Sequence, residues 1–463
     1  MLKWLLEVDD LNLADIADKT VALAQKSGAS QAEVYAIHVK TASVYIDDDI
    51  PKIGISMVES GIGLKYILGK RIGFTSSTLA QEGPSEVVER AKSLARASNE
   101  DPKFVSLPEP KRVSGLPDKF HDKDTAAADT ELLMGKAMEV VKSASSEAVT
   151  VPNGSLRTSS VHYHISNSLG INAGSKGTVT FGFFTAKSEK NGNVGEGVQR
   201  CWSREIGSID FGKLGEKLNS QAMSVLKAKP FKKKWDDAVG ILTPSEGSEM
   251  MYQLIAYAVS GENVNKRSSP WSDKMGEKVA SENLTIYDNG LSDKGILGSI
   301  VDDEGVPTQK TSILEDGVLQ SYLFDSYNAN QLDLPPTGNG IRRTPRELAG
   351  RFSVAAVCAG TTMEIQPSSK SVEDLISEVK RGVFIEHFAY PLVDQMTGSF
   401  SNEVRNARII ENGELGDQIK YALWIGNLFD SIKGDLHVAN NLEVHDKKII
   451  PSIAFPNTEL VGQ

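Results

Sequence analysis

The segment GIGLKYILGKRIGFTSST, residues 61–78, contains two β-rich runs that meet at Leu68-Gly69-Lys70. Glycine allows the positive φ value that a tight turn between two strands requires, so we predict a β-hairpin here. The segments around it show the periodicities of strands and helices, with strands expected at 33–40 and 43–47 and helices at 11–27 and 84–98. Together they predict an N-terminal α/β unit over residues 1–100.

The rest of the chain predicts a linker and two further units. Residues 101–122 are proline-rich and lack periodicity, as linkers do. Residues 123–235 combine helices at 125–144 and 211–228 with three β-rich runs between them, which predicts a middle α+β unit. Residues 236–463 are mostly β and are expected to form a large, mostly antiparallel domain. We therefore assign the chain to the α+β class.

Two dipeptides in the last unit predict further hairpins. Asp316-Gly317 and Asn412-Gly413 each lie between β-rich runs. Asx-Gly pairs readily take the positive φ values of tight hairpin turns, so two neighbouring antiparallel strands are expected at each site.

Composition and charge narrow the classes of function. The chain has 61 Asp and Glu against 50 Lys and Arg, a formal net charge of −11. This disfavours a protein that binds nucleic acid by neutralising phosphates, and it argues against docking on an anionic membrane. There is no signal-peptide pattern and no apolar run of transmembrane length. Only two cysteines occur, Cys201 and Cys358, so we expect a cytoplasmic protein without disulfides, in which Cys358 is a buried small residue.

The segment TPSEGSEMMYQLIAYAVSGENVNKRSS, residues 243–269, predicts an amphipathic helix. Thr243-Pro244-Ser245-Glu246 has the pattern of a capping box, and Gly261 is the expected stop. Tyr252 and Tyr257 lie at the borders of the apolar face, which by itself indicates core packing with two hydroxyls directed outward. The apolar face consists of Met250, Met251, Leu254, Ile255, Ala258 and Val259.

Three polar clusters elsewhere in the sequence give weaker evidence for metal or anion binding. His162 and His164 alternate along one expected strand and point to one face, where a shared metal is possible but a polar strand side is favoured. Asp302-Asp303-Glu304 is interpreted as an acidic turn rather than a cation site. Arg342 and Arg343 follow a glycine-rich segment and are able to hold a carboxylate or a phosphate.

An ordered set of motifs resembles the TldD/PmbA family, whose members are also called modulators of DNA gyrase. The set spans the chain from about residue 30 to residue 460. Besides the hairpin at 61–78, the matching segments are ISNSLGINA (165–173), SDKMGEKVASENLTIYDNG (272–290), VDDEGVPTQKTSILEDGVLQSYLFD (301–325), PTGNGIRR (336–343), MTGSFSNEVRNARIIENGEL (396–415) and WIGNLFD (424–430).

The resemblance implies a function for the helix at 243–261. In the TldD branch this helix carries HExxxH, in which two histidines hold a catalytic zinc and the glutamate is the general base. Here the hexad falls on residues 252–257, so Tyr252 and Tyr257 replace the histidines and Gln253 replaces the glutamate. Neutral tyrosine is a poor zinc ligand and glutamine cannot act as a base. The family's late cysteine ligand is also missing, since its neighbourhood here is LEVHDKKIIP with Glu443 and His445.

The resemblance therefore places the chain with the PmbA/TldE branch. It implies a non-catalytic subunit, without a cofactor of its own, of a heteromeric metallopeptidase that degrades or processes small unfolded peptides. A TldD-like subunit would bring the zinc, although self-association as a homodimer is also open. Tyr252, Gln253, Tyr257 and His445 would line a degenerate site.

Two alternatives remain. In the first, the chain is itself a peptidase with other metal ligands, such as His162 with His164 or Glu443 with His445. In the second, it is a non-enzymatic scaffold that binds peptides or proteins.

Overall fold

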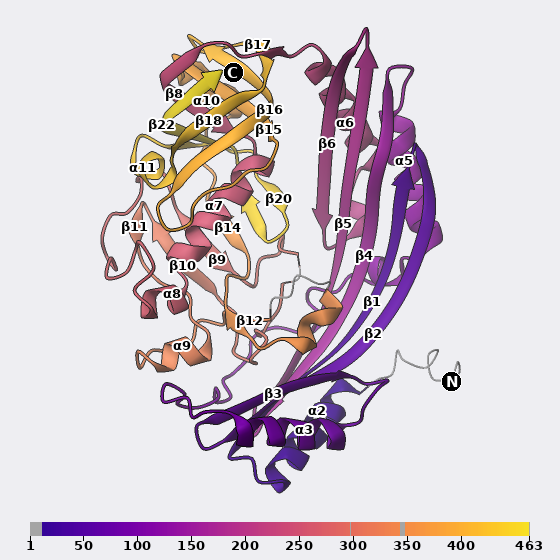
Figure 1. Ribbon diagram of the computed structural model, residues 1–463, viewed down its shortest axis with the longest axis vertical. Coiled ribbons are helices and arrows are strands. Elements are labelled where there is room, and N and C mark those ends of the chain that lie inside the picture. The colour runs from indigo at the N-terminus through magenta and orange to yellow at the C-terminus, as the bar shows by residue number, and fades with distance from the viewer. Residues whose placement is uncertain (1–11, 297, 343–347, 463) are drawn as a thin grey trace.

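The chain folds into a long, curved sheet that stands beside a β-rich C-terminal domain (Figure 1). The computed structural model describes residues 12–296, 298–342 and 348–462. The curved sheet has six strands in the order β3-β2-β1-β4-β5-β6, and every neighbouring pair is antiparallel. Its strands are β1 (Gln31–Asp47), β2 (Ile50–Leu68), β3 (Arg71–Thr78), β4 (Val149–Asn167), β5 (Asn172–Lys190) and β6 (Asn193–Ser203).

This sheet corrects the predicted division into an N-terminal and a middle unit. Strand β1 pairs with β4 from Glu33 to Asp47, so the two units share one sheet across the boundary at 101–122. The sequence could not show this pairing, because it joins segments more than a hundred residues apart. The strands expected at 33–40 and 43–47 are also one strand, since β1 continues through Thr41 and Ala42 with β2 on one side and β4 on the other.

Two groups of helices cover one face of the curved sheet. At one end, α2 (Leu13–Lys26) and α3 (Pro84–Ala97) bury their apolar sides on β1 and β2. At the other end, α5 (Thr130–Ala144) and α6 (Phe211–Leu226) pack on β4 and β5, and the short helix α4 (Lys123–Ala127) precedes them. The helices predicted from periodicity are therefore present. None of the described helices is long and apolar enough to cross a membrane.

The C-terminal domain is built on two sheets with a helix between them. The larger sheet runs β15-β8-β22-β18-β16-β17-β7, with β19 paired to β22, and the smaller one runs β11-β10-β9-β14-β21-β20. Most pairs are antiparallel, as predicted; β8 with β15, β7 with β17 and β14 with β21 are parallel. The strands are β7 (Lys229–Pro230), β8 (Lys234–Leu242), β9 (Ile286–Asn289), β10 (Lys310–Glu315), β11 (Val318–Leu319), β14 (Met363–Ile365), β15 (Arg381–Phe388), β16 (Ser399–Glu411), β17 (Glu414–Lys420), β18 (Ala422–Asn427), β19 (His437–Val438), β20 (Glu443–His445), β21 (Lys448–Ile450) and β22 (Ile453–Gly462).

Helix α7 (Pro244–Ala258) contributes to the core of this domain. Its apolar residues belong to the large core cluster that also holds Trp424, which packs against Phe388, Phe400 and Phe455. Further elements are a short pair of strands, β12 (Gly340–Ile341) with β13 (Val357–Cys358), and the helices α8 (Gly261–Asn265), α9 (Ser326–Asn330), α10 (Val372–Glu378) and α11 (Leu428–Lys433). The α+β class is thus confirmed.

All three predicted hairpins form. Gly69 connects β2 to β3 with φ of 65°. Asp316 and Gly317 turn β10 into β11 with φ of 47° and 76°, and Asn412 and Gly413 turn β16 into β17 with φ of 52° and 82°. Positive φ at both central positions is the geometry for which these dipeptides are suited.

Candidate functional site

Helix α7 starts where predicted, but not by the predicted cap. Thr243 is the N-cap residue and Pro244 follows it, yet the Thr243 side chain makes no capping hydrogen bond. Glu246 instead turns away from the helix: its carboxylate accepts the N–H of Phe388 at 3.0 Å and lies 3.4 Å from Nδ1 of His387. The carboxylate therefore fastens the first turn of α7 to the end of β15.

The end of α7 also differs from the prediction. The helix stops at Ala258, and Gly261 begins the next short helix, α8. A Cβ at Gly261 would lie 2.2 Å from the ring of Phe324, so glycine is needed there for close packing rather than as a helix stop. The predicted apolar face is confirmed, because Met250, Met251, Leu254, Ile255, Ala258 and Val259 are all buried.

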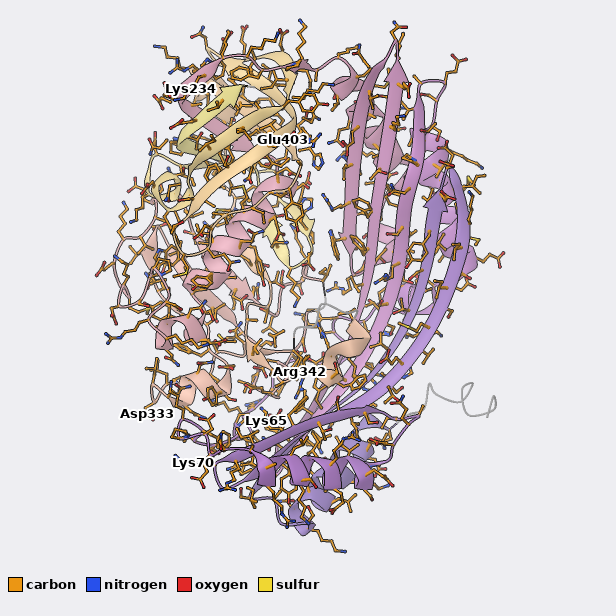
Figure 2. All side chains as sticks on the ribbon, in the orientation of Figure 1. Lys65, Lys70, Lys234, Asp333, Arg342 and Glu403 are labelled. Carbon is orange, nitrogen blue, oxygen red and sulfur yellow. The ribbon has the colours of Figure 1, made fainter. Side chains whose placement is uncertain are left out.

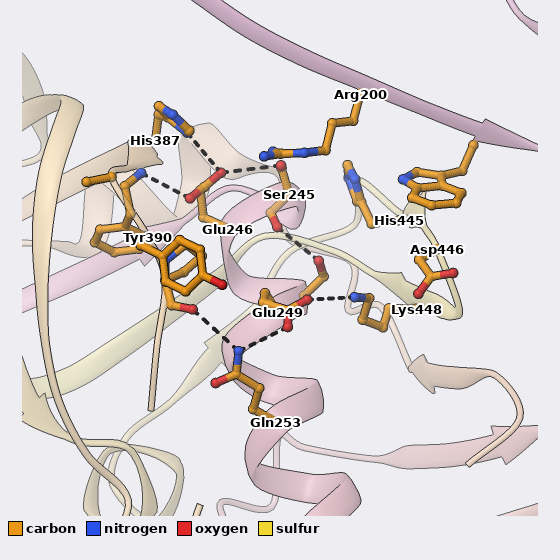
Figure 3. A pocket seen from close by; sticks show the side chains of 15 residues that line it. Arg200, Ser245, Glu246, Glu249, Gln253, His387, Tyr390, His445, Asp446 and Lys448 are labelled. Atoms are coloured by element: carbon orange, nitrogen blue, oxygen red, sulfur yellow. Dashed lines mark hydrogen bonds and ion pairs between the residues drawn. The ribbon is translucent and has the colours of Figure 1, made fainter. Parts of the chain in front are cut away.

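A cavity of about 330 Å³ lies beside the first three turns of α7, between the C-terminal domain and the edge strand β6 (Figure 3). Arg200 and Trp202 reach it from β6, and the residues 387–391 border it from the other side. Its other lining residues come from α7 and from the β20–β21 hairpin: Ser245, Glu246, Ser248, Glu249, Gln253, His445, Asp446 and Lys448.

Two of the four residues assigned to the degenerate site lie in this cavity. Gln253 and His445 both line it, although they are far apart in the sequence. Tyr252 and Tyr257 are not among the lining residues of this cavity. Tyr252 is half-buried against the core, with Lys448 5.3 Å from the centre of its ring. Tyr257 is half-buried one helical turn beyond Gln253.

Gln253 uses both ends of its amide. Its Nε2 donates to Glu249 Oε1 at 3.0 Å and to the carbonyl of Pro391 at 3.4 Å, while its Oε1 accepts the N–H of Val393 at 3.2 Å. A carboxylate at this position could accept but could not donate. The residue at the position where the resemblance places a general base thus holds the segment 391–393 in place.

Two ion pairs lie at the cavity. Glu249 accepts from Lys448 Nζ at 2.9 Å; burial opposes ionisation of Glu249, but Lys448 and Gln253 hold the pKa of that carboxyl below its usual value. His445 Nε2 lies 3.1 Å from Glu443, and this hydrogen bond lowers the pKa of Glu443. Lys448 is far from Glu249 in the sequence, so that pair could not be predicted, whereas Glu443 and His445 are two residues apart and had been named together.

The residues present do not fit a catalytic zinc. At the helix positions where the family resemblance places metal ligands, this chain offers two phenols and an amide. The nearby imidazoles, His387 and His445, each face a carboxylate of their own. Among the described residues, no group of three or more His, Cys, Asp or Glu is arranged to hold a metal ion.

A second cavity, of about 570 Å³, adjoins the first. It shares Arg200, Ser245, Glu246 and His445 with the first cavity and continues between α6 and β6 on one side and the C-terminal domain on the other. The two cavities together form an elongated space beside Val198, Gln199, Arg200 and Trp202 of β6, rather than a single compact pocket.

The other signals in the sequence lie away from these cavities. His162 and His164 are on the face of β4 opposite to Tyr163, which packs toward the C-terminal domain. His164 bonds Asn172 at 2.9 Å, and burial, with help from Lys176 and neighbouring histidines, lowers the pKa of His162 to about 4. Cys358 is buried, as expected.

The acidic turn is buried and forms part of a junction between the curved sheet and the C-terminal domain. Asp302 accepts the N–H groups of Glu304, Val306 and Gly340, each at 2.9 Å. Arg342 is fully buried and holds a carboxylate of the chain itself, Glu33 on β1, at 3.0 Å. Figure 2 shows Arg342 and Lys65 on the two sides of this junction. Arg343 lies outside the described residues.

The fold and the cavity together define a class of protein: a curved antiparallel sheet faces a β-rich domain, with a helix of that domain and the edge of the sheet enclosing an elongated space. Residues 239–462 match the family model of the PmbA/TldA metallopeptidase C-terminal domain, and residues 32–95 match that of PmbA/TldA metallopeptidase domain 1. The two matches cover more than half of the chain. The chain belongs to the PmbA/TldD family.

Individual relatives agree with this assignment. A metalloprotease of Methanocaldococcus jannaschii is 27% identical over 80% of this chain and 81% of its own length. The metalloprotease PmbA of Escherichia coli O157:H7 is 22% identical over 88% of this chain and 86% of its own. The crystal structure of TldE from Thermococcus kodakarensis superimposes with a TM-score of 0.88 at 23% identity, covering 96% of this chain and 99% of that one. At 23% identity, the comparison with TldE supports the similarity of fold alone.

Proposed function

We propose that this chain is the non-metal-binding subunit of a heteromeric metallopeptidase, which acts on small unfolded peptides and takes its zinc from a TldD-like partner subunit. The observation that carries the proposal is the hydrogen bonding of Gln253. The position that would hold a general base is occupied by an amide whose donor and acceptor are both engaged with the segment 391–393 and with Glu249. Such a side chain has a structural task and no basic lone pair.

The shape of the site supports a peptide as the ligand. The two adjoining cavities run along β6, which is an edge strand of the curved sheet. An edge strand offers main-chain donors and acceptors to which an extended peptide can add as a further strand with little dependence on sequence. On β6, the N–H of Val198 is already bound to Oε1 of Gln221, at 2.9 Å. Trp202 and Tyr390 border the cavity and provide apolar surface for side chains of such a peptide.

The test is to measure metal content and peptide hydrolysis of the purified chain, alone and mixed with a TldD-like relative from the same organism. We expect the chain alone to be free of stoichiometric zinc and inactive, and the mixture to form a complex that cleaves unfolded peptides. The TldD-like protein alone is the control for activity that does not need this chain.

Two results would overturn the proposal. About one zinc per subunit together with cleavage by the chain alone would show a peptidase with ligands of its own. Failure to form a complex, with no change in the activity of the relative, would leave the chain as a separate peptide- or protein-binding scaffold.

A further inference from the structure

Another cavity, of about 410 Å³, lies at the end of the molecule that carries β3, α8 and α9 (Figure 1). Its walls come from β2, β3, the linker at 103–107, the two short helices and the segment 355–357. Among the described residues, it shares no lining residue with the two cavities beside β6. Its volume lies within the range of sites that bind small molecules.

Part of the cavity wall is apolar. Phe104 and Leu107 are buried against Ile67 of β2, and Ile72 of β3 packs on the same small cluster. Such a wall removes an aliphatic group of a ligand from water, which favours binding. The apolar lining residues are Ile72, Phe104, Leu107, Ala355, Ala356 and Val357.

Two buried carboxylates also line the cavity. Glu304 and Asp325 are only 2% and 3% exposed. Oε2 of Glu304 accepts the N–H of Ser326 at 2.8 Å, and Oδ1 of Asp325 accepts the N–H of Asn328 at 2.9 Å. The other oxygen of each carboxylate accepts no hydrogen bond from a described residue. Because Ser326 directly follows Asp325, the two carboxylates are neighbours, and each offers an unused acceptor.

The cations of the chain do not compensate these two charges. Lys65 Nζ lies 4.0 Å from Glu304, beyond hydrogen-bond distance, and closer to Glu33, at 3.4 Å. Lys65 also attracts Asp325, but among the described residues no cation forms an ion pair with that carboxylate. Burying a carboxylate without a partner is costly, so this part of the cavity favours a further cation.

Proton binding shows the same shortage of positive charge. Burial raises the pKa of Glu304 to about 7 and also raises the pKa of Asp325. The charged groups that face Glu304 are Glu33 on β1, Lys65 on β2, Asp325 before α9 and Asp302 on its own turn. Three of these four are acidic. A proton and a ligand cation would therefore compete for Glu304.

We propose that this cavity binds a small ligand whose protonated primary amino group is held by Glu304 and Asp325 and whose aliphatic part packs against Phe104 and Leu107. An ammonium group has three donors and no acceptor, which suits two carboxylate oxygens that lack donors. A metal ion suits the cavity less well, because the described part of the chain contains no group of three or more His, Cys, Asp or Glu arranged to hold one.

Two sources provide this ligand chemistry: a free hydrophobic amino acid and the amino end of a peptide. Lys103 lines the cavity at an exposed position and is able to bind the carboxylate of a free amino acid. A peptide would instead continue out of the cavity. In either form the site is separate from the cavities beside β6, so the proposal does not depend on the function proposed above.

Isothermal titration calorimetry of the full chain tests the ligand class with four probes. Isoamylamine carries the amino group and the aliphatic part alone, and it should bind. N-acetyl-L-leucinamide has the aliphatic part without the amino group, and it should bind at least about tenfold more weakly. L-leucine and Leu-Gly-Gly distinguish the sources: the tighter of the two identifies the free amino acid or the peptide end as the ligand.

The pH dependence gives a second readout. Isoamylamine stays protonated between pH 5.5 and pH 8, whereas Glu304 loses its proton as the pH rises through about 7. The affinity for isoamylamine should therefore be about tenfold higher at pH 8 than at pH 5.5. This increase should be smaller in Glu304→Gln, which does not titrate at this position.

Matched variants test the two carboxylates. Asp325→Asn keeps an acceptor for the N–H of Asn328, and Glu304→Gln keeps one for the N–H of Ser326, so both should fold. Each should weaken the binding of isoamylamine at pH 8 by about tenfold or more. Asp333→Asn is the control, because Asp333 is exposed just after α9 and its φ of 55° is one that asparagine adopts readily. It should leave the affinity unchanged.

Three outcomes would overturn the proposal. No binding of isoamylamine at millimolar concentration would mean that a proton alone compensates the carboxylates. Undiminished binding to both Asp325→Asn and Glu304→Gln would place the amine elsewhere on the chain. Equal binding of N-acetyl-L-leucinamide would show that apolar contact, and not the ammonium group, is what the cavity recognises.

Discussion

At the scale of the residue, Gln253 shows why an amide fits a position that resembles that of a catalytic glutamate. It lies between Glu249, the carbonyl of Pro391 and the N–H of Val393, and two of these three partners are acceptors. Only a side chain that carries both a donor and an acceptor can form hydrogen bonds with all three of these groups. An amide at this position therefore anchors the 391–393 segment and cannot serve as a base.

This account predicts the effect of restoring a carboxylate. Gln253→Glu should lower the free energy of unfolding by about 1–3 kcal/mol at pH 7, because the donor is lost and an anion is placed beside Glu249 and a carbonyl. Protonation restores a donor, and crowding by Glu249 should raise the pKa of the introduced carboxyl in the folded state. The stabilising contribution of its protonated form is then lost as the pH rises. Urea unfolding at pH 5 and pH 7 measures this, and an equal defect at both values would contradict it.

Glu304 provides a second prediction at this scale. Burial raises the pKa of Glu304 to about 7, against the attraction of Lys65 and with help from the charges of Glu33 and Asp325. Between the ordinary value of a glutamate and pH 7, the folded state holds a proton that the unfolded state releases. The contribution of Glu304 to stability is thus present at low pH and is lost as the pH rises through about 7.

Glu304→Gln removes this titration and keeps an acceptor for the N–H of Ser326. The stability of the variant relative to the wild type should therefore increase from pH 5 to pH 8, by on the order of 1–3 kcal/mol. Urea unfolding across this range provides the measurement, with Glu315→Gln, at an exposed position on β10, as the control. A difference that does not vary with pH would refute the prediction.

At the scale of the element, the first turn of α7 is held by β15 rather than by its own cap. Glu246 is buried, and its carboxylate binds the N–H of Phe388 and approaches His387 at the point where β15 ends. This contact fixes the distance between the helix and the residues 389–391 that border the cavity. The helix and the strand therefore shape the site as a pair.

Replacing Glu246 tests this connection. Glu246→Leu should destabilise the fold by about 1–3 kcal/mol, because the N–H of Phe388 would be buried without an acceptor. Glu246→Gln retains an acceptor oxygen and should lower the free energy of unfolding by clearly less than Glu246→Leu does. Urea unfolding of both variants at pH 7 distinguishes them, and equal losses would mean that the hydrogen bond to Phe388 is not what the carboxylate contributes.

At the scale of the whole molecule, a buried ion pair joins the curved sheet to the C-terminal domain. Arg342 and Glu33 have no exposed side-chain surface, and their charged groups lie 3.0 Å apart. Lys65 on β2 stands 3.4 Å from Glu33 and 4.0 Å from Glu304 (Figure 2). These contacts, together with the ring of Tyr35 4.6 Å from the guanidinium, set how the two parts of the molecule meet across the site.

Breaking this pair on one side should be costly. Arg342→Met leaves Glu33 buried without its main partner and should lower the free energy of unfolding by about 3–5 kcal/mol. The double variant Glu33→Leu with Arg342→Met removes both charges and should recover much of that loss. Urea unfolding of the single and double variants gives the coupling free energy between Arg342 and Glu33. If the losses in the free energy of unfolding are additive, the two residues do not stabilise the fold as a pair.

Local sequence determined much of the fold. The Asx-Gly and Gly turns form because their backbone conformations are intrinsic to these residues, and the amphipathic helices form because their apolar spacing matches the helical repeat. The buried side of α7 follows from its sequence in the same way, as does the absence of imidazole from residues 252–257. Each of these features depends on neighbours within a few residues.

Tertiary structure alone decided the rest. The pairing of β1 with β4 unites two segments that local patterns had separated, because strand pairing depends on partners distant in the chain. The cavity gathers Arg200, Gln253, His387 and His445 from four separate stretches. Tyr252 is not in its lining, because its side chain packs against the core, and Tyr257 lies one helical turn beyond Gln253. The sequence predicts Glu246 as the partner of Thr243 in a capping box, but the N–H of Thr243 donates to the carbonyl of Ile385 at 3.2 Å, and the carboxylate of Glu246 accepts the N–H of Phe388 instead.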